Sequence, residues 1–300
     1  MKKTYIGVFV ALLVIYIILA FALPGDPGVL KKYGLSTVGS RLLNLTIVLP
    51  IAAIYLAGLY SFIRIRDYAD KISKTKEGPA FDTLAKGVMV LAYSLPINSI
   101  ISSYASYVRH ANPGLLPEIT VVRQYLALIL AFTAIVLIAR GVRGLYDTLG
   151  ARTVRGQSFL DLVGPVVLAS VYTWLVVSHY NSEPGTAPYY LPIGLVILTI
   201  AIPYIYAWCV GARAALQLRR YREGVKGSIY KRSINNIAKG IAVVIVISIM
   251  LQVLTTLSGL LNRLELTPLL AVIYVLIAFY VVGYGLIARG AKQLRLIEEA

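Results

Sequence analysis

Residues 240–258 read GIAVVIVISIMLQVLTTLS, a run of 19 residues without a charged side chain. A helix of that length is long enough to cross a hydrocarbon layer about 30 Å thick. Lipid offers no hydrogen-bond partners to a backbone, so a segment that crosses it must be helical. The stretch therefore predicts a transmembrane helix.

Similar apolar runs occur along the whole chain. Hydrophobic residues make up 58% of the 300 residues and charged residues only 14%, whereas soluble domains carry about 25% charged residues. The sequence therefore predicts an all-α integral membrane protein with eight transmembrane helices. The seven other predicted spans are 5–23, 42–63, 87–108, 122–139, 159–178, 191–212 and 268–288.

The residues around 240–258 recur in the first half of the chain. The tetrapeptide Ile237-Ala238-Lys239-Gly240 matches Leu84-Ala85-Lys86-Gly87 at an offset of 153 residues, and LIARG at 137–141 matches LIARG at 286–290 at an offset of 149. Chance similarity between apolar runs explains matched leucines but does not explain matched glycines, prolines and basic residues in one order. Further pairs at an offset of 153 are Pro50 with Pro203, Gly58 with Gly211, and Tyr68 with Tyr221.

We expect two four-helix repeats, residues 1–150 and 151–300. Four is an even number of crossings, so both repeats enter and leave on the same side of the membrane and are parallel. They are then related by a pseudo-two-fold axis along the membrane normal, unlike the inverted repeats of many transporters.

The net charge of +16 reflects where the basic residues lie. With the N-terminus inside, 23 Lys and Arg fall on the cytoplasmic side and six on the outer side. This asymmetry predicts a multi-pass protein of the plasma (inner) membrane with both termini in the cytoplasm. It accounts for the charge without a nucleic-acid partner.

The N-terminal segment also resembles a signal peptide, with Lys2-Lys3, an apolar run and Ala20-Phe21-Ala22. We expect the segment to be retained, because its apolar run of about 18 residues exceeds the usual 7–15 of a signal sequence.

The basic residues on the inner side are candidate contacts for anionic lipid headgroups. They lie within or at the edges of two predicted inner loops, 64–86 and 213–239, and at two span ends. The second loop has the sequence to continue the sixth helix into the cytoplasm. The alternative is a solvated loop without a ligand. The candidates are Lys86, Arg140, Arg219, Arg220, Arg222, Lys239 and Arg289.

Two polar faces interrupt the apolar helices. Ser99, Ser102 and Ser103 share one helix face, and at an offset of 153 they become Gln252, Thr255 and Thr256; Asn98 extends the first face. One interpretation is hydrogen bonding between helices, worth about 0.6 kcal/mol per bond. The other is the lining of a cavity in the outer half of the membrane.

Two prolines are candidate hinges, Pro50 and Pro203, because both predicted repeats carry one at the same place; ordinary packing kinks are the alternative. The two histidines, His110 and His179, lie at outer helix ends and are too few for most metal or haem sites. We therefore expect no cofactor. No nucleophile elbow, P-loop, H-E-x-x-H or C-x-x-C motif occurs, so we do not expect an enzyme.

These features favour a non-enzymatic bundle that handles a small or lipid-like ligand, or that scaffolds a membrane complex. The expected partners are membrane lipids and another membrane protein. Two alternatives stay open: a channel or transporter for an uncharged solute, and a redox subunit that uses His110 and His179.

Overall fold

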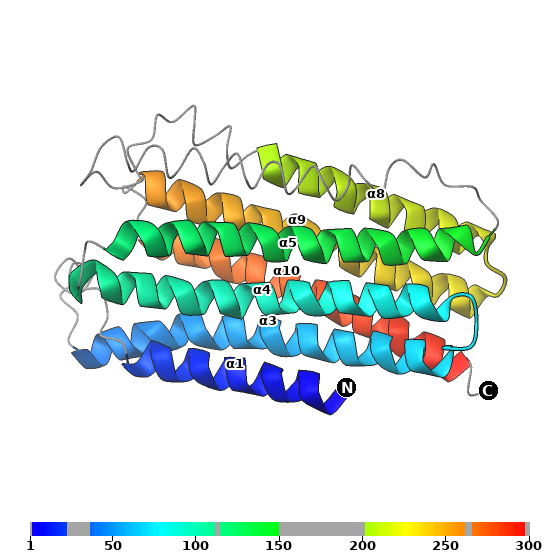
Figure 1. The fold of residues 1–300 in the computed structure, drawn as a ribbon, viewed down its shortest axis with the longest axis horizontal. Coiled ribbons are helices and arrows are strands. Elements are labelled where there is room, and N and C mark those ends of the chain that lie inside the picture. The colour runs from blue at the N-terminus through cyan, green and yellow to red at the C-terminus, as the bar shows by residue number, and fades with distance from the viewer. Residues whose placement is uncertain (1, 23–36, 112–114, 150–201, 262–265, 298–300) are drawn as a thin grey trace.

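The computed structural model describes residues 2–22, 37–111, 115–149, 202–261 and 266–297, which form seven α-helices and no strand (Figure 1). The all-α prediction is confirmed for these residues. The predicted span 159–178 and the first part of 191–212 lie outside them, so the count of eight stays a prediction. The helices are α1 (Lys2–Ala22), α3 (Thr37–Lys71), α4 (Gly78–Ala111), α5 (Leu116–Asp147), α8 (Ile202–Gly224), α9 (Ser228–Leu261) and α10 (Leu266–Ile297).

Four stretches of these helices are long and apolar enough to cross a membrane. Each lies within a helix that overlaps a predicted span, and α1 adds a shorter apolar stretch, Ile6–Ile18. The described chain therefore has the helices of a multi-pass membrane protein. The four stretches are Val48–Lys71, Gly78–Ile101, Ile129–Asp147 and Ala271–Ile297.

Six of the helices form a closed ring of neighbours. Each packs against the next in the order α3, α4, α5, α8, α9 and α10, and α10 returns to α3. The helices run side by side along the long axis of the molecule (Figure 1). We call the end that holds the α3–α4 turn (72–77) and the α8–α9 turn (225–227) the charged end, for the residues described below.

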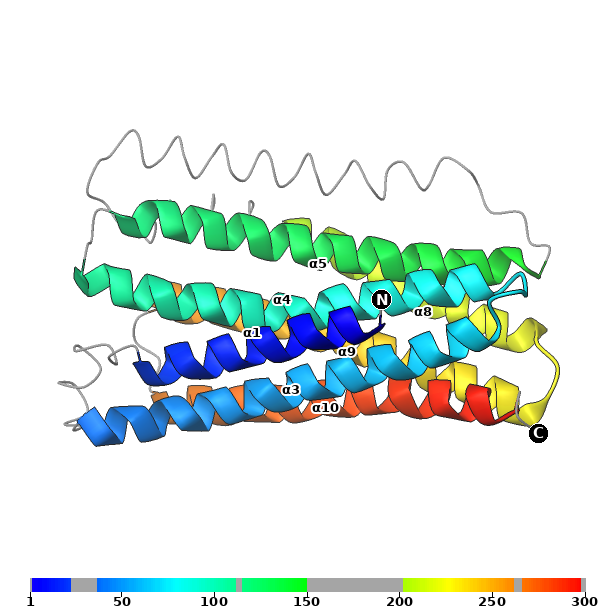
Figure 2. The ribbon, with the colours of Figure 1, turned by 60° about the horizontal axis from the view of Figure 1, so that its bottom comes forward.

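Helix α1 lies outside this ring, against α3 and α4 (Figure 2). The ring of Phe9 stacks on Tyr55 with centroids 4.3 Å apart, and it also contacts Tyr93 of α4. The Tyr55 hydroxyl donates a hydrogen bond of 2.6 Å to the Phe9 carbonyl oxygen. This aromatic group fixes α1 to the bundle.

Glycines permit the closest helix contacts in the ring. A Cβ atom placed on Gly87 would lie 2.7 Å from the backbone nitrogen of Ile138, and one on Gly141 would lie 2.7 Å from that of Leu84. Any larger side chain at either glycine would push α4 and α5 apart.

The same contacts recur between α9 and α10. A Cβ on Gly240 would meet Ile287, and one on Gly290 would meet Ile237, and these residues correspond to the four above at offsets of 153 and 149. A duplicated chain would be expected to repeat these glycine contacts in both helix pairs, and the two pairs do so. The full arrangement of four plus four helices stays a prediction.

The predicted inner loops, 64–86 and 213–239, are largely helical, so their bounds are wrong, whereas the helical continuation expected for the second loop agrees with α8. Helix α3 continues to Lys71 and α4 begins at Gly78, so only a short turn separates them, and α8 likewise continues to Gly224. Hydropathy identifies only the apolar part of a helix. The charged part of α3 remains helical because it is amphipathic and buries Ile65, Tyr68 and Ala69 in the core.

Replacing Gly240 by alanine tests the close contact between α9 and α10. The new methyl group would lie 2.5 Å from the carbonyl oxygen of Gly283, so we expect a loss of about 1–3 kcal/mol in unfolding free energy. The measurement is unfolding of the purified protein in a detergent series. Gly285→Ala is the matched control, since a Cβ there meets nothing within 4 Å; equal losses in both variants would contradict the account.

Candidate functional site

Basic residues lie at one level on all six helices of the ring. The level follows from Gly58 of α3, which faces both Ala92 of α4 and Tyr284 of α10. Arg64 lies six residues from Gly58 towards the charged end. Six residues from Ala92 in the same direction is Lys86, and five residues from Tyr284 is Arg289. We call these residues and their neighbours on the other helices the basic collar: Arg64, Lys86, Arg140, Arg213, Lys239 and Arg289.

Two further contacts place the other members of the collar close to this level. Gly87 lies against Ile138, which puts Arg140 beside Lys86, and Gly240 lies against Ile287, which puts Lys239 beside Arg289. A side chain at Gly224 would meet Leu149. Arg140 lies nine residues before Leu149 and Arg213 lies eleven residues before Gly224, so the two arginines are within about one helical turn of the same level.

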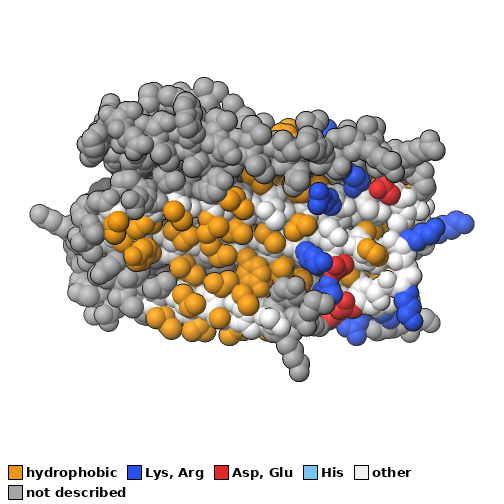
Figure 3. Space-filling view, viewed as in Figure 1, with side chains coloured by type: hydrophobic (Ala, Val, Ile, Leu, Met, Phe, Trp, Pro, Cys, Tyr) orange, Lys and Arg blue, Asp and Glu red, His pale blue; other side chains and the backbone are white. Residues whose placement is uncertain are grey.

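The collar separates two kinds of surface. Figure 3 shows hydrophobic side chains over the part of the bundle away from the charged end, and Lys, Arg, Asp and Glu gathered towards that end. All collar side chains are exposed except that of Arg64, which is half-buried with its guanidinium 4.9 Å from the ring centre of Tyr60. Long basic side chains at an apolar boundary extend their charges to the polar layer, where they can form charge-assisted hydrogen bonds to phosphate groups.

The predicted lipid contacts divide into two groups in the structure. Lys86, Arg140, Lys239 and Arg289 belong to the collar. Arg219 and Arg220 lie at least six residues nearer the charged end. Arg222 is partly buried, and its Nη1 donates a hydrogen bond of 3.0 Å to Oδ1 of Asn235.

Sequence reasoning missed two collar residues, Arg64 and Arg213. Each directly follows a predicted apolar span, 42–63 or 191–212, and that position was the available signal.

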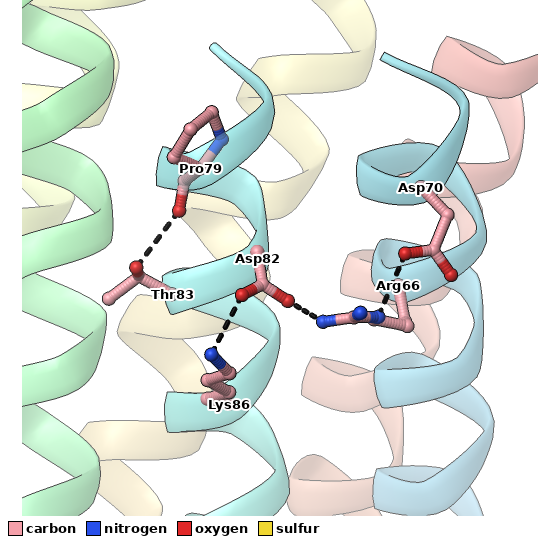
Figure 4. Close-up of polar contacts among 6 residues, drawn as sticks. All are labelled: Arg66, Asp70, Pro79, Asp82, Thr83 and Lys86. Carbon is pink, nitrogen blue, oxygen red and sulfur yellow. Dashed lines mark hydrogen bonds and ion pairs between the residues drawn. The ribbon is translucent and has the colours of Figure 1, made fainter. Parts of the chain in front are cut away.

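An ion-pair network joins α3 to α4 beyond the collar (Figure 4). The Arg66 guanidinium pairs with Asp82 of α4 and, at 3.0 Å, with Asp70 of its own helix. Lys86 of the collar reaches the other oxygen of Asp82 at 2.8 Å. Asp82 thus links a collar residue to the charged end of α3.

A second polar cluster joins opposite sides of the ring at the charged end. Glu77 precedes α4, and its two carboxylate oxygens accept hydrogen bonds from the hydroxyls of Tyr221, at 2.6 Å, and Tyr230, at 3.1 Å. The hydroxyl of Tyr68 lies 3.4 Å from that of Tyr230. Because the one hydroxyl hydrogen of Tyr230 is directed to Glu77, Tyr68 is the donor in this contact. We call these four residues the Glu77 cluster.

The cluster is held in a largely buried environment. Tyr68 and Tyr221 are almost fully buried, and Glu77 and Tyr230 are partly buried. Burial raises the pKa values of the Tyr221 and Tyr230 hydroxyls, so both stay protonated and remain donors to the carboxylate. The members come from α3, the α3–α4 turn, α8 and α9, so the cluster ties the first three helices of the ring to the last three.

Little in the amino-acid sequence indicates the Glu77 cluster. Its only signal was the match between Tyr68 and Tyr221 at an offset of 153. Glu77 and Tyr230 are also 153 residues apart, which places a carboxylate and a tyrosine at equivalent positions of the two predicted repeats.

The polar faces proposed from the sequence are only partly described. Ser99 of α4 is hydrogen-bonded to the Tyr16 hydroxyl of α1, so this part of the face lies against α1. The side chains of Ser102, Ser103, Gln252, Thr255 and Thr256 lie outside the described residues. Whether the two faces meet stays a prediction.

The candidate hinges and histidines are placed as follows. Helix α3 runs without interruption through Pro50, and Pro203 is the second residue of α8 as described. The side chain of His110, in the last turn of α4, and all of His179 lie outside the described residues. Within the described part of the chain, no group of three or more His, Cys, Asp or Glu is arranged to hold a metal ion.

Comparison of the chain with protein-family models, with curated proteins and with solved structures found no match in any of the three.

Replacing Glu77 by glutamine tests the cluster. The neutral amide cannot accept charge-assisted hydrogen bonds from both tyrosines, so we expect a loss of about 1–3 kcal/mol in unfolding free energy. Combining Glu77→Gln with Tyr221→Phe should cost less than the sum of the two single changes. The measurement is the same detergent unfolding series.

The matched control for this cluster is Glu223→Gln. Its side chain is 62% exposed and its nearest ion pair, with Arg222, is 3.6 Å long, so we expect almost no change. Strict additivity of the Glu77 and Tyr221 changes would show that the two side chains do not act together.

Proposed function

We propose that this chain is a non-enzymatic, multi-pass membrane bundle that binds anionic lipids through its basic collar. The apolar surface would lie in the hydrocarbon layer and the collar at the level of the lipid phosphates. The charged end would project into the cytoplasm. The observation that carries the proposal is the presence of one Lys or Arg on each of six neighbouring helices at nearly the same level.

Helix lengths support this placement. Helices α3, α4, α5, α9 and α10 have 32 to 35 residues, or about 48–52 Å. A bilayer core needs only about 20 residues. The predicted spans of α3, α4, α5, α9 and α10 are about that long, and each ends directly beside its collar residue.

The chemistry of the collar favours lipids with a net negative charge over zwitterionic ones. Each Lys or Arg near an anionic leaflet gains about 1 kcal/mol from its surface potential. Several such residues around one bundle would therefore hold a shell of anionic lipid, as a lipid-handling or scaffolding protein requires.

The test is to remove three collar charges with Arg140→Gln, Lys239→Gln and Arg289→Gln in one variant. For the unchanged protein, we expect a higher unfolding temperature in nanodiscs that contain phosphatidylglycerol than in phosphatidylcholine alone. The variant should lose most of that difference, and high salt should reduce it in the unchanged protein.

The matched control removes three charges beyond the collar, with Lys74→Gln, Lys76→Gln and Lys231→Gln. These side chains are exposed and lie about 10 Å or more past the collar, so the lipid-dependent difference should persist. If both triple variants lose it equally, net charge and not the collar is responsible, and the proposal fails.

A further inference from the structure

The two hairpins at the charged end differ in charge. Residues 65–85, at the tip of the α3–α4 hairpin, contain four basic and four acidic residues. The equivalent residues at an offset of 153, 218–238 of the α8–α9 hairpin, contain six basic residues and one acidic residue. The net charges are therefore 0 and +5.

The difference of five charges comes from three fewer carboxylates and two more basic residues in the second hairpin. The positions of Asp67, Glu77 and Asp82 in the first hairpin are occupied by Arg220, Tyr230 and Asn235 in the second.

The carboxylates of the first hairpin form ion pairs with basic residues of this hairpin and of α10. Asp82 pairs with Arg66 and Lys86, and Asp67 pairs with Arg295 of α10 at 3.5 Å.

The second hairpin has only one carboxylate for the same task. Glu223 lies 3.6 Å from Arg222, whose other contact is the neutral amide of Asn235. Most of the positive charge of this hairpin is therefore not balanced from within it.

The same hairpin also carries an exposed apolar side chain. Ile229, in the first turn of α9, is 61% exposed. We call Ile229 and the exposed basic residues around the α8–α9 turn the cationic tip: Arg219, Arg220, Lys226, Ile229, Lys231 and Arg232.

The cationic tip lies beyond the reach of lipid headgroups at the collar. Arg219 is six residues past Arg213, and Lys231 is eight residues before Lys239, which correspond to about 9 and 12 Å along their helices. These distances equal or exceed the Debye length of about 8 Å at physiological salt. In the membrane placement proposed above, on which this step rests, the tip would therefore face the aqueous phase.

We propose that the cationic tip is a docking surface for an acidic protein segment that carries an apolar anchor residue. Carboxylates of the partner would pair with Arg220 and its basic neighbours, and an apolar side chain would cover Ile229. The exposed isoleucine favours a protein over a nucleic acid as the partner, because an apolar side chain of a protein can cover it and a phosphate backbone cannot. The proposal goes beyond lipid binding and uses none of the collar residues.

The test uses the full chain in phosphatidylcholine nanodiscs with the collar intact. The probe is a fluorescein-labelled, 12-residue peptide of glutamates with two leucines, and its dissociation constant is measured by fluorescence anisotropy at 150 mM salt. The variant Arg220→Asp with Asn235→Asp restores two carboxylates of the first hairpin and lowers the net charge by three. We expect it to bind about tenfold more weakly.

Two further variants distinguish docking from general charge attraction. Lys74→Glu with Lys76→Gln also lowers the net charge by three, but on the other hairpin, and should leave the affinity within about twofold. Ile229→Ser changes no charge and should weaken binding about fivefold through lost apolar contact. Unchanged unfolding temperatures for all variants would show that folding is intact.

Three results would overturn the proposal. They are equal weakening by both charge variants, no effect of Ile229→Ser, and tighter binding of a single-stranded oligonucleotide of equal charge than of the peptide. Loss of phosphatidylglycerol dependence in the collar variant is a separate measurement, so failure of one proposal would be distinguishable from failure of the other.

Discussion

A hydrocarbon layer about 30 Å thick accommodates about 20 residues of helix, yet α3, α4, α5, α9 and α10 run for 32 to 35 residues. In the proposed membrane placement, about a fifth to a third of each of these helices lies past its collar residue and stands in water. On the face shown in Figure 3, the charged side chains gather towards that end. The collar marks the change of solvent, and the need to satisfy charged and polar groups governs the structure beyond it.

The two solvents call for different means of holding helices together. In lipid, apolar surface gives little drive for association, so packing depends on close contact. Gly87 and Gly240 provide it by admitting the backbones of α5 and α10. Beyond the collar, ion pairs such as Arg66 with Asp82 and the shared carboxylate of Glu77 link the same helices. Close glycine contacts suit the part in lipid, because polar groups are costly there. The ion pairs suit the part in water, where they contribute more when they are partly buried than when they are fully exposed.

Hydropathy was enough to predict the apolar cores of the helices, because lipid leaves the backbone no alternative to a helix. It placed the end of α3 wrongly at Arg64, because the helix continues there to Lys71 through packing that an average over apolar residues does not detect. The continuation of α8 past Arg213 was expected from the sequence of that segment. The collar was partly predictable, since a basic residue follows several apolar runs. The Glu77 cluster was not, because Tyr221 and Tyr230 are 144 and 153 residues from Glu77 in the sequence. Only the three-dimensional ring brings them together.

The central claim is that the basic collar lies at the edge of the hydrocarbon layer. Spin labels placed along α10 test this claim most directly. Single cysteines would replace Val275, Phe279, Lys292 and Leu296, which are all exposed, in a protein whose exposed Cys209 has been changed to serine. In liposomes, labels at 275 and 279 should be relaxed mainly by oxygen, and labels at 292 and 296 mainly by a water-soluble nickel complex. The change should fall near Arg289. Preferential oxygen relaxation at 296, equal to that at 279, would contradict the account.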